Sequence, residues 1–328
     1  MKRSLGKLFA LLSSYCIKVK VHSGTEGFTP TKAVVTIGMF DGLHKGHRLL
    51  LQQTVDNAGR IGGESVVITF WPHPRLVLGK DNGSMRFLTS LEERTLMFSR
   101  QGIDHLVILP FTKELAALTA RQFIQQILIS QIGMVHLVVG FDHRFGSDGH
   151  LQSPNYENYS HEYGFGVTRV DAVMANGVKA SSSTIRQLLG QGRIEAANVL
   201  LGYPYTVTGR VVGGQRLGRT IGYPTANIEV GETAKLIPLD GVYACRVRVL
   251  GRKFNGMLNI GYRPTVSKQL DFRTIEVHLL DFTDDIYSEE VSVEFVARVR
   301  NEMQFQGVEA LKAQLMRDEK TIRDLLSQ

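Results

Sequence analysis

The chain is expected to fold as an α/β protein in two parts: a doubly wound parallel sheet, then a small antiparallel β-barrel with a closing helix. Two patterns predict this. Between residues 33 and about 173, short β-branched apolar runs alternate with helical patterns, whereas after residue 203 apolar and polar side chains alternate along each strand. The length of 328 residues suits two domains of about 150 residues each.

Continuous apolar runs predict the strands of the parallel sheet. Such runs are typical of strands buried on both faces, and they lie at residues 33–37, 66–70, 106–109 and 135–139. Between them, Ser90 with Glu93 and Thr119 with Gln122 have the capping-box spacing that begins a helix. Ligands of such a fold lie beyond the carboxyl ends of the strands, which makes the segments after the strands the candidate site.

The second half of the chain predicts a barrel. Residues 181–202 are helical in pattern, and alternating strands follow, as in residues 242–249. The helix that closes the barrel is predicted from apolar residues at helical spacing, namely Val308, Leu311, Leu315, Ile322 and Leu325. The expected boundaries are an N-terminal extension at 1–20, an α/β domain at 21–180, a helical connection at 181–202 and a barrel domain at 203–328.

Composition narrows the class of partner. The net charge is +7, but Lys and Arg are scattered, so the excess favours phosphate-bearing small molecules and no nucleic-acid partner is expected. No stretch approaches the ~20 apolar residues of a membrane span, so no membrane partner is expected either. The two cysteines, Cys16 and Cys245, are too few for a disulfide framework, which favours the cytoplasm.

The segment GMFDGLHKGH at 38–47 is the strongest functional signal. Gly38, Gly42 and Gly46 let the backbone turn sharply and approach a ligand, and the N–H groups that open the following helix favour an anion. His44 and His47 are three residues apart, so they share one face of the first helical turn. Two imidazoles there can hydrogen-bond a phosphoryl oxygen, and the segment therefore predicts a phosphate site.

This HxGH arrangement resembles the nucleotidylyltransferase superfamily, and the whole segment resembles its branch in the bacterial bifunctional riboflavin kinase/FAD synthetases. Further segments similar to that family follow in order: TFWPHP at 69–74, GFDHRFG at 140–146, SSSTIR at 181–186, GYPTAN at 222–227, NIGYRPT at 259–265 and EVH at 276–278. The resemblance implies a nucleotidylyltransferase-type sheet and a riboflavin kinase-type barrel. It also implies that ATP is the co-substrate, FMN and FAD are products, and Mg²⁺ is the metal.

By this resemblance the first part transfers AMP from ATP to FMN, which yields FAD and pyrophosphate. His44 and His47 would contact the ATP phosphates, and Arg186 would stabilise the pyrophosphate leaving group. The other residues expected to bind ATP are Gly38, Phe40, Asp41, Gly42, Gly46, Ser181, Ser182 and Ser183. Asp142 either contacts the flavin or caps a turn, and both interpretations remain open.

The chain departs from the family pattern at three positions and in one segment, Ser147-Asp148-Gly149-His150, which lacks the arginine that the family has there. Met39 stands where a small polar residue is usual, Trp71 replaces a polar residue before Pro72, and His143 replaces an aromatic residue. Neither Met39 nor Trp71 is a predicted phosphate ligand. His143 lies in the segment from which a flavin contact is expected.

In the second part the resemblance implies that Thr225 and Asn227 hold Mg²⁺ and the ATP phosphates, since Mg²⁺ prefers oxygen ligands. The nucleotide loop would contribute Gly214, Gly218 and Arg219. Glu276 lies on the polar face of an alternating strand, and by resemblance it is the general base for the riboflavin 5′-hydroxyl. Arg300 and Phe305 would line the flavin or nucleotide pocket, although simple packing of Phe305 is an equal alternative.

Overall fold

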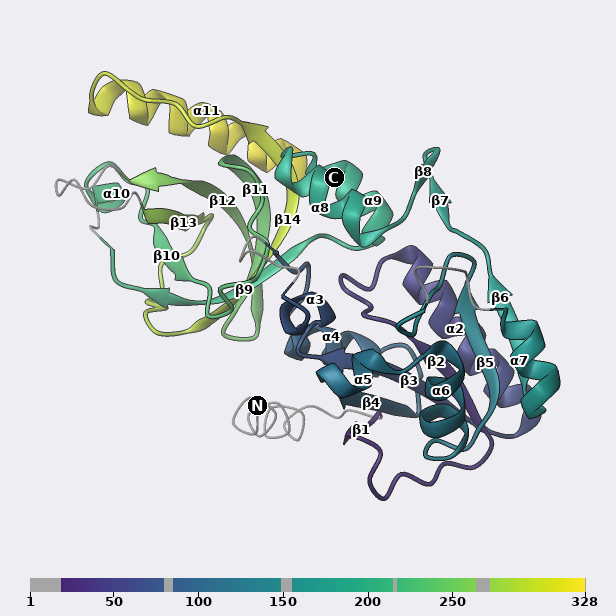
Figure 1. Ribbon diagram of the computed structural model, residues 1–328. Helices are drawn as coiled ribbons and strands as arrows, with labels where there is room; N and C mark the ends of the chain where they lie inside the picture. Colours follow the sequence, from purple (N-terminus) through teal and green to yellow (C-terminus); the bar gives the residue numbers. More distant parts are fainter. Residues whose placement is uncertain (1–18, 80–84, 149–154, 215–216, 264–271, 328) are drawn as a thin grey trace. The chain divides into compact units, whose positions relative to one another are not determined.

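A computed structural model describes residues 19–79, 85–148, 155–214, 217–263 and 272–327 (Figure 1). The chain divides into two compact units, unit 1 (Met1–Ala180) and unit 2 (Ser181–Gln328). The N-terminal extension expected at 1–20 lies outside the described residues, apart from its last two positions. Among the described residues, no helix combines the length and the apolar character needed to cross a membrane.

Unit 1 is built on a six-stranded sheet in the order β1-β4-β3-β2-β5-β6, and every pairing in it is parallel. The strands are β1 (Lys20–Ser23), β2 (Ala33–Ile37), β3 (Glu64–Trp71), β4 (His105–Pro110), β5 (Met134–Gly140) and β6 (Gly166–Val170). The four apolar runs of the sequence are therefore β2, β3, β4 and β5. A separate two-stranded ribbon joins β7 (Met174–Ala175) to β8 (Val178–Lys179).

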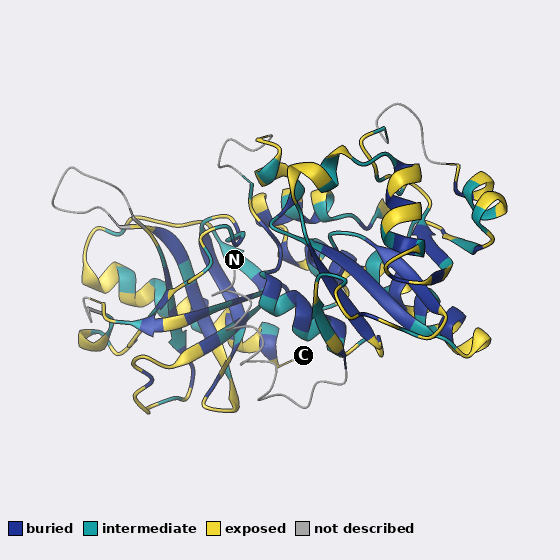
Figure 2. Cartoon of the chain, turned by 60° about the horizontal axis from the view of Figure 1, so that its bottom comes forward, coloured by how far each residue is buried: buried dark blue, intermediate teal, exposed yellow. Residues whose placement is uncertain are grey.

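Helices cover both faces of this sheet. They are α2 (Lys45–Ile61), α3 (Pro74–Val77), α4 (Leu91–Ser99), α5 (Lys113–Ala117), α6 (Ala120–Phe123), the π-helix η1 (Ile124–Ile129) and α7 (Tyr156–Tyr163). One apolar cluster joins the sheet to α2 and α4, and a second joins the opposite face to α6, η1 and α7. The central strands β2, β3 and β4 are accordingly buried along most of their length (Figure 2), whereas the edge strands β1 and β6 are mostly half-buried or exposed. Both predicted capping boxes, at Ser90 and Thr119, are present.

The topology places the ligand site of unit 1. Strand β2 pairs with β3 on one side and β5 on the other, so the strand order reverses between β2 and β5. In open α/β sheets ligands bind at this switch point, beyond the carboxyl ends of the strands. The segments that follow β2 and β5 are those the sequence predicts for the site.

Unit 2 is a closed antiparallel barrel in the order β10-β13-β12-β11-β14-β9. Its strands are β9 (Thr206–Val212), β10 (Ala226–Glu229), β11 (Gly241–Val249), β12 (Arg252–Arg263), β13 (Phe272–Leu279) and β14 (Glu290–Arg300). Its helices are α8 (Ser182–Gly190), α9 (Ile194–Leu201), α10 (Leu217–Thr220) and α11 (Val308–Leu326). The fold class predicted from the sequence is confirmed in both units.

Helix α11 covers the barrel with its C-terminal half. Ile322 and Leu326 pack against Val242 and Ala244 on the outer face of β11. The expectation that Val308 also covers the barrel is wrong, because its side chain is 57% exposed. The apolar residues of α11 keep their helical spacing toward its N-terminus, beyond the part of the helix that contacts the barrel.

Helices α8 and α9 pack on the barrel too. Asn198 of α9 donates through Nδ2 to the Phe295 carbonyl at 2.9 Å and accepts from the Tyr205 N–H at 2.7 Å. The Leu239 N–H donates to the Leu189 carbonyl at 3.1 Å. The segment 181–202, which the sequence suggests is a connection, thus shares hydrogen bonds and buried surface with the barrel.

Candidate functional site

The loop between β2 and α2, residues 38–44, is held in an unusual backbone shape. The Gly38 N–H donates to the Ile68 carbonyl at 3.0 Å, which continues the sheet into the loop. Phe40 and Leu43 then adopt positive φ angles of 50° and 34°, although neither is glycine and both are buried. Such conformations cost of order 1–3 kcal/mol each and persist where surrounding contacts fix them, often at functional sites.

Asp41 supplies several of those contacts. Its carboxylate accepts from the Leu88 N–H at 3.0 Å, and from the N–H and the hydroxyl of Thr89 at 3.0 and 3.1 Å. The Gly42 N–H donates to the Thr89 hydroxyl oxygen at 3.0 Å. These bonds tie the loop to the segment that begins α4, and the expected contact of Asp41 with ATP stays a prediction.

The two histidines lie together at the start of α2. His44 is the N-cap, and its Nδ1 accepts from the His47 N–H at 3.4 Å. The rings stack with centroids 3.7 Å apart, and an added Cβ on Gly46 would lie only 3.2 Å from the His44 ring. Because Nδ1 of His44 is an acceptor, the proton of the neutral ring is on Nε2. Gly46 thus permits the stacked pair.

His47 is neutral at ordinary pH. Burial, followed by the charges of His44 and Arg94, holds its pKa well below the usual value of 6.5. Its Nδ1 is buried and has no hydrogen-bond partner within the part of the chain that the structure describes. Neutral His47 adds no charge to this helix N-terminus, so the N–H groups at the start of α2 and the ring N–H groups remain the donors for a phosphate.

The remaining residues predicted for adenylyl transfer lie at the N-terminus of α8 in unit 2. Ser181 is the N-cap of that helix, and its Oγ accepts from the Thr184 N–H at 3.2 Å. Ser182 and Ser183 form the first helical positions, and Arg186 follows one turn later, half-buried. Their contacts with the same ATP as His44 and His47 stay predictions.

In the segment after β5, Asp142 makes a contact that the sequence does not indicate. Asp142 forms an ion pair with Lys179 of β8 at 2.5 Å, and the Lys179 ammonium lies 4.2 Å from the Phe141 ring centroid. Both charged groups are largely exposed, so the pair adds little stability. The predicted contact of Asp142 with the flavin stays untested.

His143, which departs from the family pattern, fills an aromatic position as a neutral ring. Its Nδ1 is 3.1 Å from the Tyr156 hydroxyl, and its ring packs against Phe145 and Tyr156. Burial lowers its pKa from 6.5 to about 4. The imidazole therefore serves as an aromatic packing group at neutral pH.

In unit 2 the predicted metal and catalytic residues come together on the barrel. The Thr225 hydroxyl donates to Oε2 of Glu276 at 3.2 Å. Asn227 of β10 is paired in register with Glu276 of β13, and Asn259 of β12 is paired with Glu276 on the other side. Hydroxyl, amide and carboxylate oxygens thus converge on a small patch, which is the donor chemistry that Mg²⁺ prefers.

Two glycines let the nucleotide loop lie against this patch. An added Cβ on Gly214 would come within 2.0 Å of the Asn227 amide, and one on Gly218 would come within 2.1 Å of the Tyr223 carbonyl. A side chain at Gly214 would push the loop away from Asn227 of β10, and one at Gly218 would displace the Tyr223 carbonyl. Arg219, on α10, is exposed, so its guanidinium is accessible to a ligand.

Arg300 and Phe305 are close to each other near α11. The Arg300 guanidinium forms an ion pair with Asp318 at 2.7 Å and lies 5.8 Å from the Phe305 ring centroid. Sequence reasoning missed Asp318, which is almost fully buried. A signal was present, because this charge interrupts the apolar stripe between Leu315 and Ile322.

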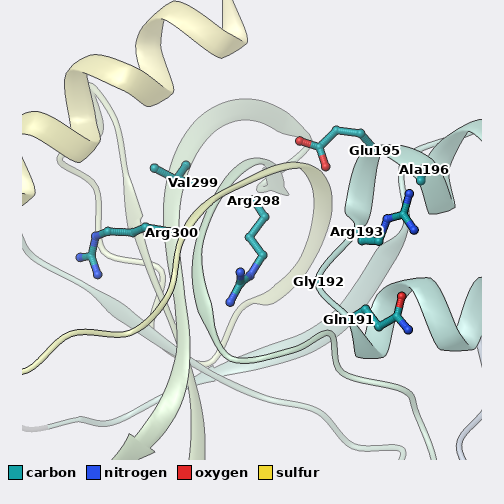
Figure 3. Close-up of a pocket in the computed structure, with 8 residues that line it drawn as sticks. All are labelled: Gln191, Gly192, Arg193, Glu195, Ala196, Arg298, Val299 and Arg300. Carbon is teal, nitrogen blue, oxygen red and sulfur yellow. The ribbon is translucent and has the colours of Figure 1, made fainter.

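A cavity of about 430 Å³ lies in unit 2 (Figure 3). It is lined by Gln191, Gly192, Arg193, Glu195, Ala196, Arg298, Val299 and Arg300. Arg298 was not a predicted site residue; it donates through Nη2 to the Asp240 carbonyl at 2.6 Å and packs against Gly192. The cavity lining includes Arg300 but neither Thr225 nor Glu276, so the cavity is separate from the patch predicted to bind the metal.

Comparisons with known proteins also divide the chain into two parts. A family model described as FAD synthetase matches residues 28–184, and one described as riboflavin kinase matches residues 201–326. The chain is 40% identical over 299 residues to the bifunctional riboflavin kinase/FMN adenylyltransferase of Listeria monocytogenes, covering 91% of this chain and 94% of that protein. It is 39% identical over 292 residues to the protein of the same name in Escherichia coli K12, covering 89% and 92%.

One solved structure is similar over nearly the whole chain. It comes from Streptococcus pneumoniae, is described as a macrolide-efflux protein, and is 33% identical. The superposition has a TM-score of 0.84 and covers 94% of this chain and 99% of that one. The two-unit fold is therefore shared with a protein solved by crystallography.

Proposed function

Because the chain belongs to the family of bifunctional riboflavin kinases/FMN adenylyltransferases, we propose that it makes both flavin cofactors. The barrel phosphorylates riboflavin to FMN with ATP. The α/β part then transfers AMP from a second ATP to FMN, which yields FAD and pyrophosphate. The observation that carries the proposal is the presence in one chain of the stacked His44–His47 pair and the Thr225–Glu276 hydrogen bond.

The proposed domains follow the boundaries expected from the sequence. Residues 21–180 form the FMN adenylyltransferase, 181–202 the helical connection and 203–328 the riboflavin kinase. Support comes from the two family models, of which the first ends at residue 184 and the second begins at residue 201, so that most of α8 and α9 lies between them. The hydrogen bonds of Asn198 to the barrel further suggest that the connection is structurally part of the kinase.

Adenylyl transfer needs no protein nucleophile, because the FMN phosphate attacks the α-phosphorus of ATP directly. The protein's contribution is positioning and charge stabilisation. His44 donates from Nε2 to a phosphate oxygen, and neutral His47 lies stacked beneath it at the N-terminus of α2. Arg186 stabilises the departing pyrophosphate with its fork of N–H donors.

Phosphorylation of riboflavin needs a base for the 5′-hydroxyl. Glu276 takes that proton, and the hydroxyl of Thr225 orients its carboxylate. Thr225 and Asn227 would hold Mg²⁺ together with the ATP phosphates. The metal, when bound, neutralises phosphate charge.

The flavin of the kinase reaction is proposed to lie toward Arg300 and Phe305. Arg300 is paired in register with Val242, Val242 with Asn259, and Asn259 with Glu276. Three strand spacings of about 4.8 Å thus separate Arg300 from Glu276 along the barrel wall. This span supports a binding site that is long enough for a ring system at one end and a reactive hydroxyl at the other.

The scarcity of cysteine further supports a cytoplasmic enzyme. The proposed activity is tested by incubating the full chain with riboflavin, ATP and Mg²⁺ and separating the flavins by chromatography. FMN is expected first and FAD later, with ADP matching the FMN formed and pyrophosphate matching the FAD. Chelation of Mg²⁺ should stop FMN formation. Absence of both FMN and FAD from the folded chain would refute the proposal.

A further inference from the structure

Arg94 is a buried cation beside the adenylyltransferase site that no sequence motif indicates. It lies on α4, four positions after the N-cap Ser90, and its side chain is only 1% exposed. Charged side chains are rarely buried to this degree unless they are paired. Its burial also means that it cannot touch a bound nucleotide, so any role in catalysis must act through other residues.

The Arg94 guanidinium reaches the loop that precedes the histidines. Nη1 donates to the Met39 carbonyl oxygen at 2.5 Å. A charged donor makes this bond stronger than an ordinary backbone hydrogen bond. Since the contact uses the backbone of residue 39, the departure of Met39 from the family pattern leaves it intact.

Arg94 contacts the loop next to the residues that bind Asp41. The Asp41 and Gly42 bonds to Leu88 and Thr89 lie just before α4, and Arg94 lies in its first turns. Arg94 of α4 and the two residues before its N-cap, Leu88 and Thr89, therefore hold the loop at residues 39, 41 and 42. These contacts offset the cost of the positive φ angles at Phe40 and Leu43.

The charge of Arg94 also reaches the histidine pair. Together with burial and His44, it lowers the pKa of His47. His44 and Arg94 are the titratable groups that act on His47 in the described part of the chain. The same guanidinium thus bears on both the backbone before His44 and the protonation of His47.

We propose that Arg94 is a positioning residue for adenylyl transfer: by holding the Met39 carbonyl it fixes the loop that places His44 on His47. This inference rests on the proposed function of unit 1. Arg94 lies outside every recognised motif, and its proposed role is to keep the phosphate site preorganised. A misplacement of about 1 Å can cost on the order of 10²-fold in rate, so the effect is measurable.

The test compares Arg94→Met and Arg94→Lys with the matched control Arg100→Met in the full chain. Arg100 is at the C-cap of the same helix and is exposed. Arg94→Met should lower kcat for FAD formation from FMN on the order of 10²-fold, with KM for FMN nearly unchanged. Arg94→Lys, which keeps a charged donor, should lose less, and Arg100→Met should match the parent. Riboflavin phosphorylation by the same preparation should stay at the parental rate in all three.

A purely structural role gives the opposite order. Met fills the buried volume without placing a charge there, so packing alone predicts that Arg94→Met is at least as active as Arg94→Lys. That order, or a parental kcat in folded Arg94→Met, would overturn the proposal. Should unit 1 of Arg94→Met fail to fold, Arg94→Lys decides: a reduced kcat supports the positioning role and a parental kcat refutes it.

A second readout does not depend on activity. The ring signals of His47, followed by NMR across pH, should titrate at higher pH in Arg94→Met than in the parent, because a nearby positive charge has been removed. If the pH at which His47 titrates were unchanged in Arg94→Met, Arg94 would not act on the histidine pair. If the parent made no FAD, the proposed function would fail, while this titration would still test the contact.

Discussion

Glu276 is the residue on which the kinase half of the account depends most directly. Its carboxylate already accepts a hydrogen bond from Thr225, and it is paired in register with two asparagines, Asn227 and Asn259. An amide at position 276 can keep the bond from Thr225 but cannot take up a proton. A substitution of Glu276 by Gln can therefore distinguish a role in binding from a role as the general base.

Glu276→Gln should reduce FMN formation by about 10²- to 10⁴-fold, the usual cost of losing a positioned base. Riboflavin affinity should change little, and FAD formation from FMN should be unaffected. Single-turnover phosphorylation and riboflavin binding measure the two effects separately. Glu290→Gln, at an exposed position of β14, is the matched control and should behave as the parent. Weaker binding with normal chemistry would instead make Glu276 a binding residue.

His143 gives unit 1 a predicted dependence on pH. Burial lowers its pKa from 6.5 to about 4, so the unfolded chain takes up the proton at higher pH than the folded chain. The stability contributed by the neutral ring is full above about pH 6.5 and is lost as the pH falls toward 4. His143→Phe should remove this loss, and its unfolding temperature should fall less than the parent's between pH 7 and pH 4.5. If the unfolding temperatures of the variant and the parent fell equally over this pH range, His143 would not be the source of the pH dependence.

At the scale of elements, local patterns predicted local structure well. The apolar runs of β2 to β5 and the capping boxes at Ser90 and Thr119 depend on neighbours within a few residues, and the structure confirms them. Long-range contacts were not predicted. Arg94 contacts Met39 across 55 positions, and Arg300 pairs with Asp318 on another element. A single sequence gives the chemistry of such residues but not their partners.

Other differences have a physical cause as well. Val308 has the right spacing for the barrel-facing stripe of α11, but spacing indicates a face of the helix and not the extent of the surface that it covers. The helical pattern after Thr119 is realised as α6 followed by the π-helix η1. Apolar spacing at 123, 127 and 128 is compatible with either helix type, so hydrogen-bond geometry decided between them.

The packing of α8 and α9 leads to a prediction about fragments. A fragment of residues 181–328 should fold and phosphorylate riboflavin at the parental rate, because it keeps Asn198 and the buried face of α9 on the barrel. A fragment of residues 203–328 should be less stable, since the carbonyl of Phe295 and the N–H of Tyr205 lose their partner in Asn198. Losing such bonds typically costs about 1–3 kcal/mol each. Urea unfolding of both fragments measures the difference, and equal stability would show that the helices do not support the barrel.

At the scale of the whole molecule, one chain is expected to carry two sites that work independently. The histidine pair belongs to unit 1, and the Thr225–Glu276 patch belongs to unit 2. A substitution at one site should therefore leave the other reaction at its parental rate. FMN is the product of the kinase reaction and the substrate of the adenylyltransferase reaction. Loss of the unit 1 site should therefore leave FMN to accumulate, whereas loss of the unit 2 site should leave riboflavin unconverted.

The double variant His44→Ala/His47→Ala tests this central claim most directly. Given riboflavin, ATP and Mg²⁺, it should form FMN at the parental rate and accumulate it, because loss of a charge-stabilising donor costs roughly 10²- to 10³-fold in FAD formation. The kinase rate measured in the same sample controls for the amount of active protein, and circular dichroism checks that unit 1 stays folded without the N-cap that His44 provides to α2. FAD formed at the parental rate would remove the histidines from the mechanism, and a parallel loss of FMN would contradict two independent sites.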